Sequence, residues 1–309
     1  MKLGVVIVTF NRLKLLHECL EACLNQSYPF QEIFIVNNAS TDGTAEYLKE
    51  INNPKVKVFT SQKNLGGSYG FYVGVKHYEK TKLDYVLLID DDAILDKNYN
   101  QFIVKYMSDN LGISGYSGVV KTDGKIQFEH RRHLNNPNVF KETNSSIEEY
   151  HKKYFDYELS TFCGLFIPVK LIKKIKYPAK DFFIWFDDTE YSLRLLKYGK
   201  IRNINAAILN HKTTILLNKG HTWKSYYSLR NKIIILKKYF SKFQLIKYYF
   251  LLLVKSIMAK IIYFISQDVY YKLLSKMYID AFYDGKNGKL GKNEKYTFNL
   301  KMEKRKKKI

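Results

Sequence analysis

The sequence predicts an α/β protein with a mostly parallel β-sheet flanked by helices, followed by a basic helical extension. Through the first 120 residues, short apolar runs rich in β-formers alternate with segments of helical periodicity, the pattern of βαβ units. Polar residues follow several of these runs directly, and parallel sheets bind ligands at the carboxyl ends of their strands. The extension is indicated by a change of composition near residue 222, after which lysines are interleaved with aromatic and aliphatic residues.

The elements of the α/β region are expected in alternating order. Its strands are predicted at residues 3–9, 33–36, 56–60 and 85–89, and its helices at 13–25, 44–50 and 70–78. Residues 121–157 are polar and irregular, which predicts a long functional loop. A strand at 160–169, a helix at 187–198 and an apolar segment at 201–211 complete the region. The predicted domains are therefore residues 1–221 and 222–309.

Charge is distributed unevenly along the chain. The formal net charge is +22, and residues 221–309 contain 21 Lys and Arg against 5 Asp and Glu. A basic segment beside a nearly neutral body indicates a polyanionic partner, which is an anionic lipid surface, a nucleic acid or an anionic polymer. The interleaved Lys, Tyr and Leu of residues 222–283 predict a basic amphipathic segment lying on the membrane surface.

The few cysteines and the hydropathy pattern predict a cytoplasmic protein. Cys19, Cys23 and Cys163 are too few and too uneven for a disulfide framework, and the first two are expected to be buried on one helix face. The N-terminus lacks the features of a secretory leader. No uninterrupted apolar run reaches the roughly 18 residues that a spanning helix needs, so peripheral attachment to the inner face of the membrane is expected.

Three consecutive aspartates, Asp90, Asp91 and Asp92, follow the strand predicted at 85–89. Adjacent carboxylates at the end of a buried strand repel one another, and a divalent cation would relieve that repulsion. Carboxylates suit Mg²⁺ or Mn²⁺, and Mg²⁺ sites commonly combine one or two carboxylates with substrate phosphates. Because alternate strand residues share a side, Asp90 and Asp92 can face one ligand. The alternative is a solvated acidic turn or a helix cap.

A second acidic cluster follows an aromatic run. Asp187, Asp188 and Glu190 come directly after the five apolar residues 182–186. Partial desolvation raises the pKa of a carboxyl group and makes it a competent general base. The alternatives are helix capping by one of the aspartates and an i,i+4 ion pair between Glu190 and Arg194. His211 ends an apolar segment, and it can be a metal ligand or an ordinary turn residue.

The motifs together resemble those of glycosyltransferase family 2, the inverting enzymes with the Rossmann-like GT-A fold. The resemblance covers about residues 1–235, and its markers are found at 6–12, 36–44, 64–67, 90–92 and 185–194. It implies a sugar-nucleotide-dependent transferase that uses Mn²⁺ or Mg²⁺. The donor would be a nucleotide sugar, and the acceptor a glycan or a lipid-linked oligosaccharide.

The resemblance also implies roles for individual residues. Asp188 matches the general base, and the metal ligands would be Asp90, Asp92 and His211. The nucleotide-sugar contacts would come from Thr9, Asn11, Arg12, Asn38, Asn64, Gly66, Gly67, Asp90, Asp91, Trp185, Asp187 and Glu190. The family more often has Asp where this chain has Asn37.

Two motifs resemble those of galactofuranosyltransferases and favour UDP-galactofuranose as the donor. They are Asn64-Leu65-Gly66-Gly67 with its following residues, and residues 185–191, in which Phe186 is an insertion. The element Tyr226-Tyr227-Ser228-Leu229-Arg230-Asn231 is similar to one in rhamnosyltransferases, so dTDP-rhamnose is the alternative donor. Outside this class, the alternatives are a nucleic-acid-binding protein and a non-catalytic glycan-binding scaffold. The sequence disfavours the first because the basic residues lie outside the α/β body, and the second because the acidic clusters are intact.

Overall fold

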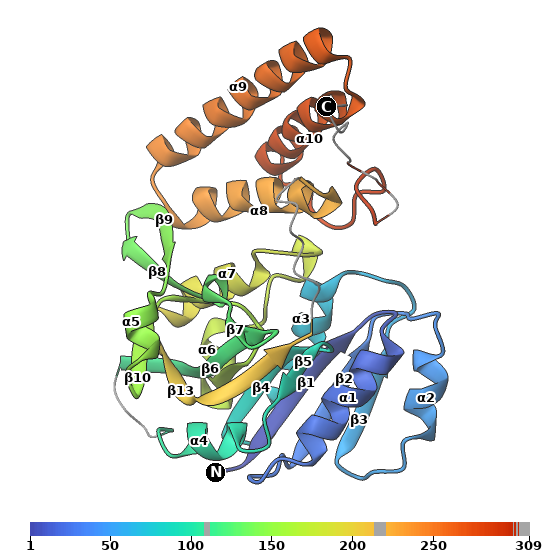
Figure 1. Ribbon diagram of the computed structural model, residues 1–309, viewed down its shortest axis with the longest axis vertical. Coiled ribbons are helices and arrows are strands. Elements are labelled where there is room, and N and C mark those ends of the chain that lie inside the picture. Colours follow the sequence, from blue (N-terminus) through green and yellow to red (C-terminus); the bar gives the residue numbers. More distant parts are fainter. Residues whose placement is uncertain (108–111, 213–220, 299, 301, 303–309) are drawn as a thin grey trace. The chain divides into compact units, whose positions relative to one another are not determined.

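The computed structural model describes residues 1–107, 112–212, 221–298, 300 and 302 (Figure 1). These residues form two compact units. The first comprises Met1–Asn135, Glu142–Lys180 and Asp187–Ile215, and the second comprises Asn136–Lys141, Asp181–Phe186 and Leu216–Ile309. Two short segments from the first two thirds of the chain thus belong to the second unit.

A mixed β-sheet forms the centre of the first unit. Within the described residues it has ten strands. Eight follow the order β10 (Tyr154–Tyr157), β13 (Gly199–His211), β6 (Gly112–Thr122), β12 (Leu165–Pro168), β4 (Tyr85–Asp90), β1 (Leu3–Thr9), β2 (Glu32–Asn37) and β3 (Val56–Thr60). Strand β1 runs parallel to β2 and β4, β2 runs parallel to β3, and β13 runs parallel to β6. Strand β12 is antiparallel to both of its neighbours. The expected α/β sheet flanked by helices is confirmed. The sheet is mixed rather than mostly parallel, because the strands that follow β4 in the chain add antiparallel pairings on one side of the parallel β3–β2–β1–β4 core.

Helices cover both faces of this sheet because its central strands are apolar on both sides. Leu3, Val5 and Ile7 of β1 pack in one core with residues of α1 (Leu13–Leu24), α2 (Thr44–Glu50) and α4 (Tyr99–Val104). Val6 and Val8 pack in the opposite core with residues of α3 (Gly67–Tyr78), α6 (Val169–Ile175) and α7 (Asp187–Leu195). A strand buried on both faces reads as an uninterrupted apolar run, as β1 does.

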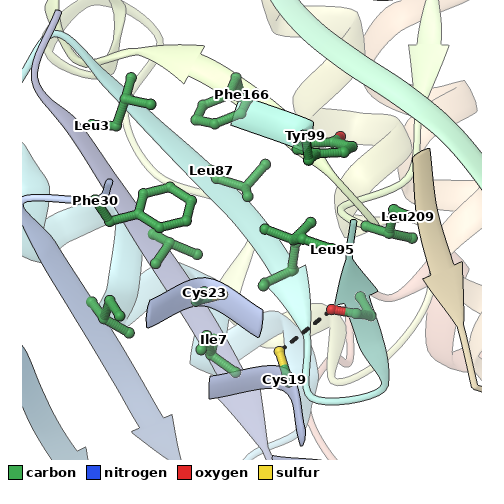
Figure 2. Close-up of a cluster of buried hydrophobic side chains, with 14 of the residues drawn as sticks. Leu3, Ile7, Cys19, Cys23, Phe30, Leu87, Leu95, Tyr99, Phe166 and Leu209 are labelled. Carbon is green, nitrogen blue, oxygen red and sulfur yellow. Dashed lines mark hydrogen bonds between the residues drawn. The ribbon is translucent and has the colours of Figure 1, made fainter. Parts of the chain in front are cut away.

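The cysteines lie in these cores, as the sequence predicts. All three are free and buried, and Cys19 and Cys23 share the inward face of α1 (Figure 2). The Cys19 thiol lies 3.4 Å from the carbonyl oxygen of Ala93, immediately after the aspartate triplet. Packing of α1 thus supports the turn that carries the triplet.

The prediction of a long irregular loop at residues 121–157 is wrong. This segment contains short elements: β7 (Lys125–Ile126), η1 (Phe128–His130), β8 (Arg131–Asn136), β9 (Val139–Asn144), α5 (Ile147–Tyr150) and β10. Strands β8 and β9 join β11 (Leu159–Ser160) in a second, three-stranded sheet. The strands are short, and many of their side chains are exposed and polar, so they lack the apolar periodicity by which longer strands are recognised.

The second unit contains three helices in its described part: α8 (Trp223–Tyr239), α9 (Lys242–Ser266) and α10 (Val269–Lys286). Buried residues from all three form one apolar cluster. By length and composition, α9 could cross a membrane, a property shared by core helices of soluble proteins. The expectation that no segment is long enough is therefore wrong. The lysines of α9 divide its sequence into short apolar runs, but the helix as a whole is still apolar enough to meet the criterion for a membrane-spanning segment.

Glycines of α3 permit close packing against β1, which provides a test of the fold. A Cβ atom at Gly74 would lie 2.2 Å from Cγ1 of Val6, whereas one at Gly67 would meet nothing within 4 Å. Gly74→Ala should lower the free energy of unfolding by about 1–3 kcal/mol through overpacking. Gly67→Ala, the matched control, should change it by less than about 1 kcal/mol. Urea unfolding measures both, and equal stability of the two variants would contradict the packing.

Candidate active site

The carboxyl ends of β1, β2 and β4 meet at one edge of the sheet. The register pairs Val8 with Asp90 and Thr9 with Asn37, so three polar strand ends are adjacent. Thr9, Asn37 and Asn38 are buried there, as are Asp91 and Asp92. Neighbouring parallel strands end together, and residues separated by about 80 positions in the chain therefore share one site.

Neighbouring side chains compensate the aspartate triplet. Thr9 Oγ1 donates a hydrogen bond of 2.7 Å to Asp91, and Arg12 lies 3.2 Å from Asp91 and 2.5 Å from Asp92. Arg12 is 44% exposed, whereas the two aspartates are almost completely buried. The cation that balances the triplet in this structure is therefore a flexible side chain entering from the solvent side.

His211 reaches the triplet through an antiparallel strand pair. Strand β5 (Ala93–Leu95) follows the triplet directly and pairs with the end of β13, where His211 lies opposite Ala93. His211 Nε2 is 3.2 Å from Oδ1 of Asp92, and the His130 ring lies edge-on to the His211 ring at 5.3 Å. The structure thus places two of the three predicted metal ligands, His211 and Asp92, side by side.

Burial and mutual repulsion distinguish the three aspartates. Desolvation, followed by repulsion from Asp92 and Asp91, raises the pKa of Asp90 to about 7. Desolvation raises the pKa of Asp91 to about 6, although Arg12 and Thr9 oppose the shift. Desolvation also acts on Asp92, but its contacts with His211 and Arg12 outweigh it and lower its pKa. Asp92 is therefore the member of the triplet that stays ionised most readily.

The chemistry of this cluster fits a divalent cation. His211 Nδ1 is buried and has no hydrogen-bond partner among the described residues, and Asp92 Oδ1 is buried with only the 3.2 Å ion-pair contact to His211 Nε2. Carboxylate oxygens and imidazole are ligands of Mn²⁺, and carboxylates with phosphates are those of Mg²⁺. Within the described chain, no three His, Cys, Asp or Glu side chains already surround a common point at ligand distance. A metal here would need Arg12 to move and phosphate or water to complete its coordination.

The second acidic pair lies at the N-terminus of α7 in the same unit. Asp187 is buried, and Asp188 is partly exposed. Burial and the adjacent Asp188 raise the pKa of Asp187 well above its ordinary value, and Asp90 adds to this shift. Asp187 and Asp188 therefore have different surroundings although they are adjacent in the chain.

Asp188 is positioned by residues that the sequence did not identify. Its Oδ1 atom accepts hydrogen bonds from the Thr189 backbone N–H at 2.5 Å and the Thr189 hydroxyl at 3.1 Å. Arg132 donates to the same hydroxyl at 3.0 Å and pairs with Glu142 at 2.6 Å. Burial raises the pKa of Asp188, while Arg132 opposes that shift. No local sequence pattern could have predicted that Arg132 on β8 lies near Asp188, because 57 positions separate Arg132 from Thr189.

Several of the residues predicted to contact the nucleotide make hydrogen bonds between the strand-end loops. Asn38 donates to Asn64 at 3.1 Å and accepts from the backbone N–H of Leu65, and Asn64 accepts from the backbone N–H of Gly66. Asn11 has a positive φ of 52° and bonds the backbone N–H of Thr41. Asn37 is fully buried and accepts from the backbone N–H of Ser40 at 3.0 Å. These amides hold together the loops that follow β1, β2 and β3.

Glu190 and Trp185 have different surroundings. Glu190 is 2% exposed and pairs with Arg194 at 2.6 Å, and Arg194 also donates to the carbonyl groups of Ile175 and Tyr177. The structure therefore contains the i,i+4 ion pair that the sequence offered as the alternative role of Glu190. Trp185 lies in the second unit, is 43% exposed and has a positive φ of 64°.

Arg230 and Asn231 bind the backbone of the aromatic segment before α7, a contact that the sequence did not predict. Asn231 Nδ2 donates to the carbonyl groups of Phe182, Ile184 and Trp185 at 2.9–3.2 Å. Arg230, which is also buried, donates to the Phe182 carbonyl at 2.9 Å. Residues 183, 185 and 186 all have positive φ, a costly conformation for bulky side chains. The two buried side chains therefore hold the strained segment that leads into Asp187 and Asp188.

Residues 4–175 match glycosyl transferase family 2, which is more than half of the chain. The fold, the strand-end site and this match define the protein as a glycosyltransferase. The chain belongs to glycosyl transferase family 2.

Two curated relatives differ in how much of their length is matched. The chain is 25% identical over 267 residues to the dolichyl N-acetyl-alpha-D-glucosaminyl phosphate 3-beta-D-2,3-diacetamido-2,3-dideoxy-beta-D-glucuronosyltransferase of Methanococcus voltae, a match that covers 82% of this chain and 80% of that protein. It is 24% identical over 177 residues to the glycosyltransferase GlyA of Streptococcus pneumoniae serotype 4, covering 56% of this chain. The latter match spans 24% of the relative's length.

The fold is shared with a solved glycosyltransferase. The crystal structure of GalNAc-T7 with UDP, GalNAc and Mn²⁺ matches with a TM-score of 0.61 and 17% sequence identity. The match covers 79% of this chain and 49% of that one. At this identity the likeness concerns the fold alone, and it confirms the expected GT-A architecture.

The Arg132 network generates a prediction on pH dependence. Arg132→Gln removes the charge that opposes the raised pKa of Asp188 and leaves Glu142 unpaired nearby, so that pKa should rise further. A base acts only when deprotonated, so the acid limb of kcat/KM should move to higher pH. Arg132→Lys should retain most of the wild-type profile, and Lys125→Gln serves as the charge-matched control. Coincident profiles for Arg132→Gln and the wild type would refute the link.

Proposed function

We propose that this glycosyltransferase is an inverting enzyme that transfers a sugar from a nucleoside diphosphate directly to an acceptor hydroxyl. The observation that carries the proposal is the presence of two acidic groups in the first unit, one at the strand-end site and one at the N-terminus of α7. The Asp90–Asp92 triplet with His211 forms one group, and Asp187 with Asp188 forms the other. One group suits a metal-bound diphosphate, and the other suits proton removal.

The proposed reaction is a single in-line displacement at the anomeric carbon. Asp188 accepts the proton of the acceptor hydroxyl while the oxygen of that hydroxyl forms a bond to the anomeric carbon. The bond from that carbon to the diphosphate oxygen breaks, and the nucleoside diphosphate leaves with the electron pair. Burial raises the pKa of Asp188, which makes it a stronger base than an ordinary aspartate. Its partial exposure gives the acceptor access, while the buried Asp187 is less accessible.

Asp92, Asp90 and His211 are the residues that would hold Mn²⁺ or Mg²⁺. The metal would stabilise the negative charge that develops on the departing diphosphate. Arg12 would then release Asp92 and turn toward the phosphates, because it is the exposed and flexible partner of the triplet. The Mn²⁺ in the GalNAc-T7 crystal structure supports the choice of metal.

The donor we infer is UDP-galactofuranose, with dTDP-rhamnose as the second candidate. The Asn64–Gly67 loop and residues 185–191 motivate the first choice, and the Tyr226–Asn231 element motivates the second. Asn38, Asn64 and the loops they bridge would surround the nucleoside, with Thr9 and Asn11 at the adjoining strand end. UDP in the GalNAc-T7 structure supports a uridine nucleotide.

The acceptor we infer is a lipid-linked oligosaccharide or another cell-envelope glycan. The archaeal relative supports a lipid-linked acceptor, because its name specifies a dolichyl phosphate glycoside and the match spans most of both chains. The intact acidic clusters favour an enzyme over the alternative of a non-catalytic glycan-binding scaffold. Membership in the family likewise disfavours a nucleic-acid-binding role.

The metal and donor proposal predicts a coupled thermal shift. UDP-galactofuranose with Mn²⁺ should raise Tm, whereas excess chelator should abolish the shift, because a ligand that binds only the folded state stabilises it. A parallel panel of dTDP-rhamnose, UDP-glucose and GDP-mannose tests the donor. Asp92→Ala should lose the metal-dependent shift yet keep its far-UV circular dichroism. A full shift in chelator would contradict the metal, and a shift with UDP-glucose alone would contradict the donor.

The base proposal predicts a specific loss of turnover. Asp188→Asn preserves shape but cannot accept a proton, so kcat should fall by about 10²–10⁴-fold while donor-induced stabilisation persists. Release of nucleoside diphosphate in the presence of acceptor measures the effect. Asp187→Asn is the matched variant one position away. If it alone were inactive, the base would be Asp187.

A further inference from the structure

One face of α9 exposes an unusual number of large apolar side chains. Ten of the twenty exposed large hydrophobic residues in the described chain lie on this helix: Phe243, Ile246, Phe250, Leu251, Ile257, Met258, Ile261, Ile262, Phe264 and Ile265. At 100° per residue they form one broad stripe along its length. A patch of this kind marks an interaction surface, because scattered apolar residues would not align.

The opposite face of α9 is already occupied within the second unit. Leu252, Ser256 and Ala259 are buried there and pack with α8 and α10. The Ser256 hydroxyl donates to the carbonyl of Ser275 on α10 at 2.9 Å. The exposed stripe is therefore the outer face of a helix whose inner face is fixed by packing.

Charges along α9 indicate what covers the stripe. The helix contains Lys242, Lys247, Lys255 and Lys260 and no Asp or Glu. Lys242, Lys255 and Lys260 project at the edges of the apolar stripe, and Lys247 lies within it near the N-terminal end. Lysines whose stems follow apolar surface while their ammonium groups reach outward fit an anionic lipid headgroup layer.

We propose that α9 binds an anionic bilayer surface, with its axis in the membrane plane and its exposed stripe in the headgroup–acyl boundary. The enzyme is then a peripheral protein of the inner face of the cell membrane. The C-terminal basic run Lys304–Lys308, which would add to the attraction for anionic lipid, lies outside the described residues. Attachment would hold the enzyme on the surface that carries a lipid-linked acceptor. Only this statement about the acceptor rests on the proposed function.

Two other occupants fit less well. A spanning α9 would draw its packed partner α10, with Asp280, Asp284 and several lysines, toward the hydrocarbon, where charges are costly. A second copy of the chain would bury Lys247 against a helix that offers no carboxylate partner. A headgroup layer satisfies both the apolar stripe and its lysines.

Vesicle co-sedimentation of the full chain tests the surface. Wild type should bind phosphatidylcholine vesicles containing phosphatidylglycerol and bind pure phosphatidylcholine much less, with release at high salt. Phe250→Ser/Ile257→Ser/Ile261→Ser should weaken binding by about tenfold or more. Val58→Ser/Ile147→Ser/Tyr198→Ser changes three other exposed apolar residues, which belong to the first unit, and should bind like wild type. Lys242→Gln/Lys247→Gln/Lys260→Gln should lose the preference for anionic lipid.

Site-specific labels test the orientation of α9. The three native cysteines are buried, so a thiol-reactive fluorophore should label a single introduced cysteine selectively. Labels at Phe243→Cys, Ile257→Cys and Phe264→Cys should show similar shallow depths by quenching with lipid-attached nitroxides. A label at Val58→Cys, the control, should show no change on vesicle addition.

Several results would overturn the inference. These are equal binding to neutral and anionic vesicles, no binding to either, or full binding by the α9 serine variant. A label at Ile257→Cys much deeper than labels at both ends would indicate a spanning helix. Lipid-independent self-association that the α9 serine changes abolish would identify a second copy as the occupant. Nucleotide-sugar binding is measured separately, so failure of membrane attachment leaves the proposed function untouched.

Discussion

The buried negative charge at the carboxyl end of β4 is the constraint on which the site depends. Three adjacent aspartates cannot all remain ionised in a poorly solvated place without cationic and hydrogen-bonding partners. Thr9 and Arg12 come from the end of β1, and His211 comes from the end of β13. The order and register of the sheet therefore assemble these partners around the triplet. In the proposed mechanism, the exposed Arg12 would exchange with a metal and a diphosphate.

The same electrostatic constraint extends to the second acidic pair. Asp187 is buried within the influence of Asp90, whereas Asp188 is partly exposed and opposed by Arg132. Two neighbouring carboxyl groups thus have different environments and different tendencies to hold a proton. Arg230 and Asn231 hold the strained segment that comes directly before Asp187 and Asp188 in the chain. The backbone that leads into the acidic pair therefore depends on buried polar contacts with residues distant in sequence.

The second unit combines two kinds of surface on one helix. The inner face of α9 contributes Leu252 and Ala259 to the packed cluster, while the outer face leaves Phe250 and Ile257 exposed. The hydrophobic effect accounts for the first face within the chain itself. In the proposed membrane attachment, the lipid surface would remove the second face from water, and its lysines would favour anionic headgroups.

The sequence by itself determined the alternation of strands and helices, the burial of Cys19 and Cys23, and the polar strand ends, because these depend on local periodicity and on which residue types tolerate burial. Tertiary structure alone decided that β5 pairs with β13 and brings His211 to Asp92, and that Arg132 lies beside Thr189. It also decided that residues 121–157 form short strands and that the apolar residues of α9 divide into a packed and an exposed face. Such features depend on contacts between residues far apart in the chain, and no local pattern encodes which distant partner a side chain meets.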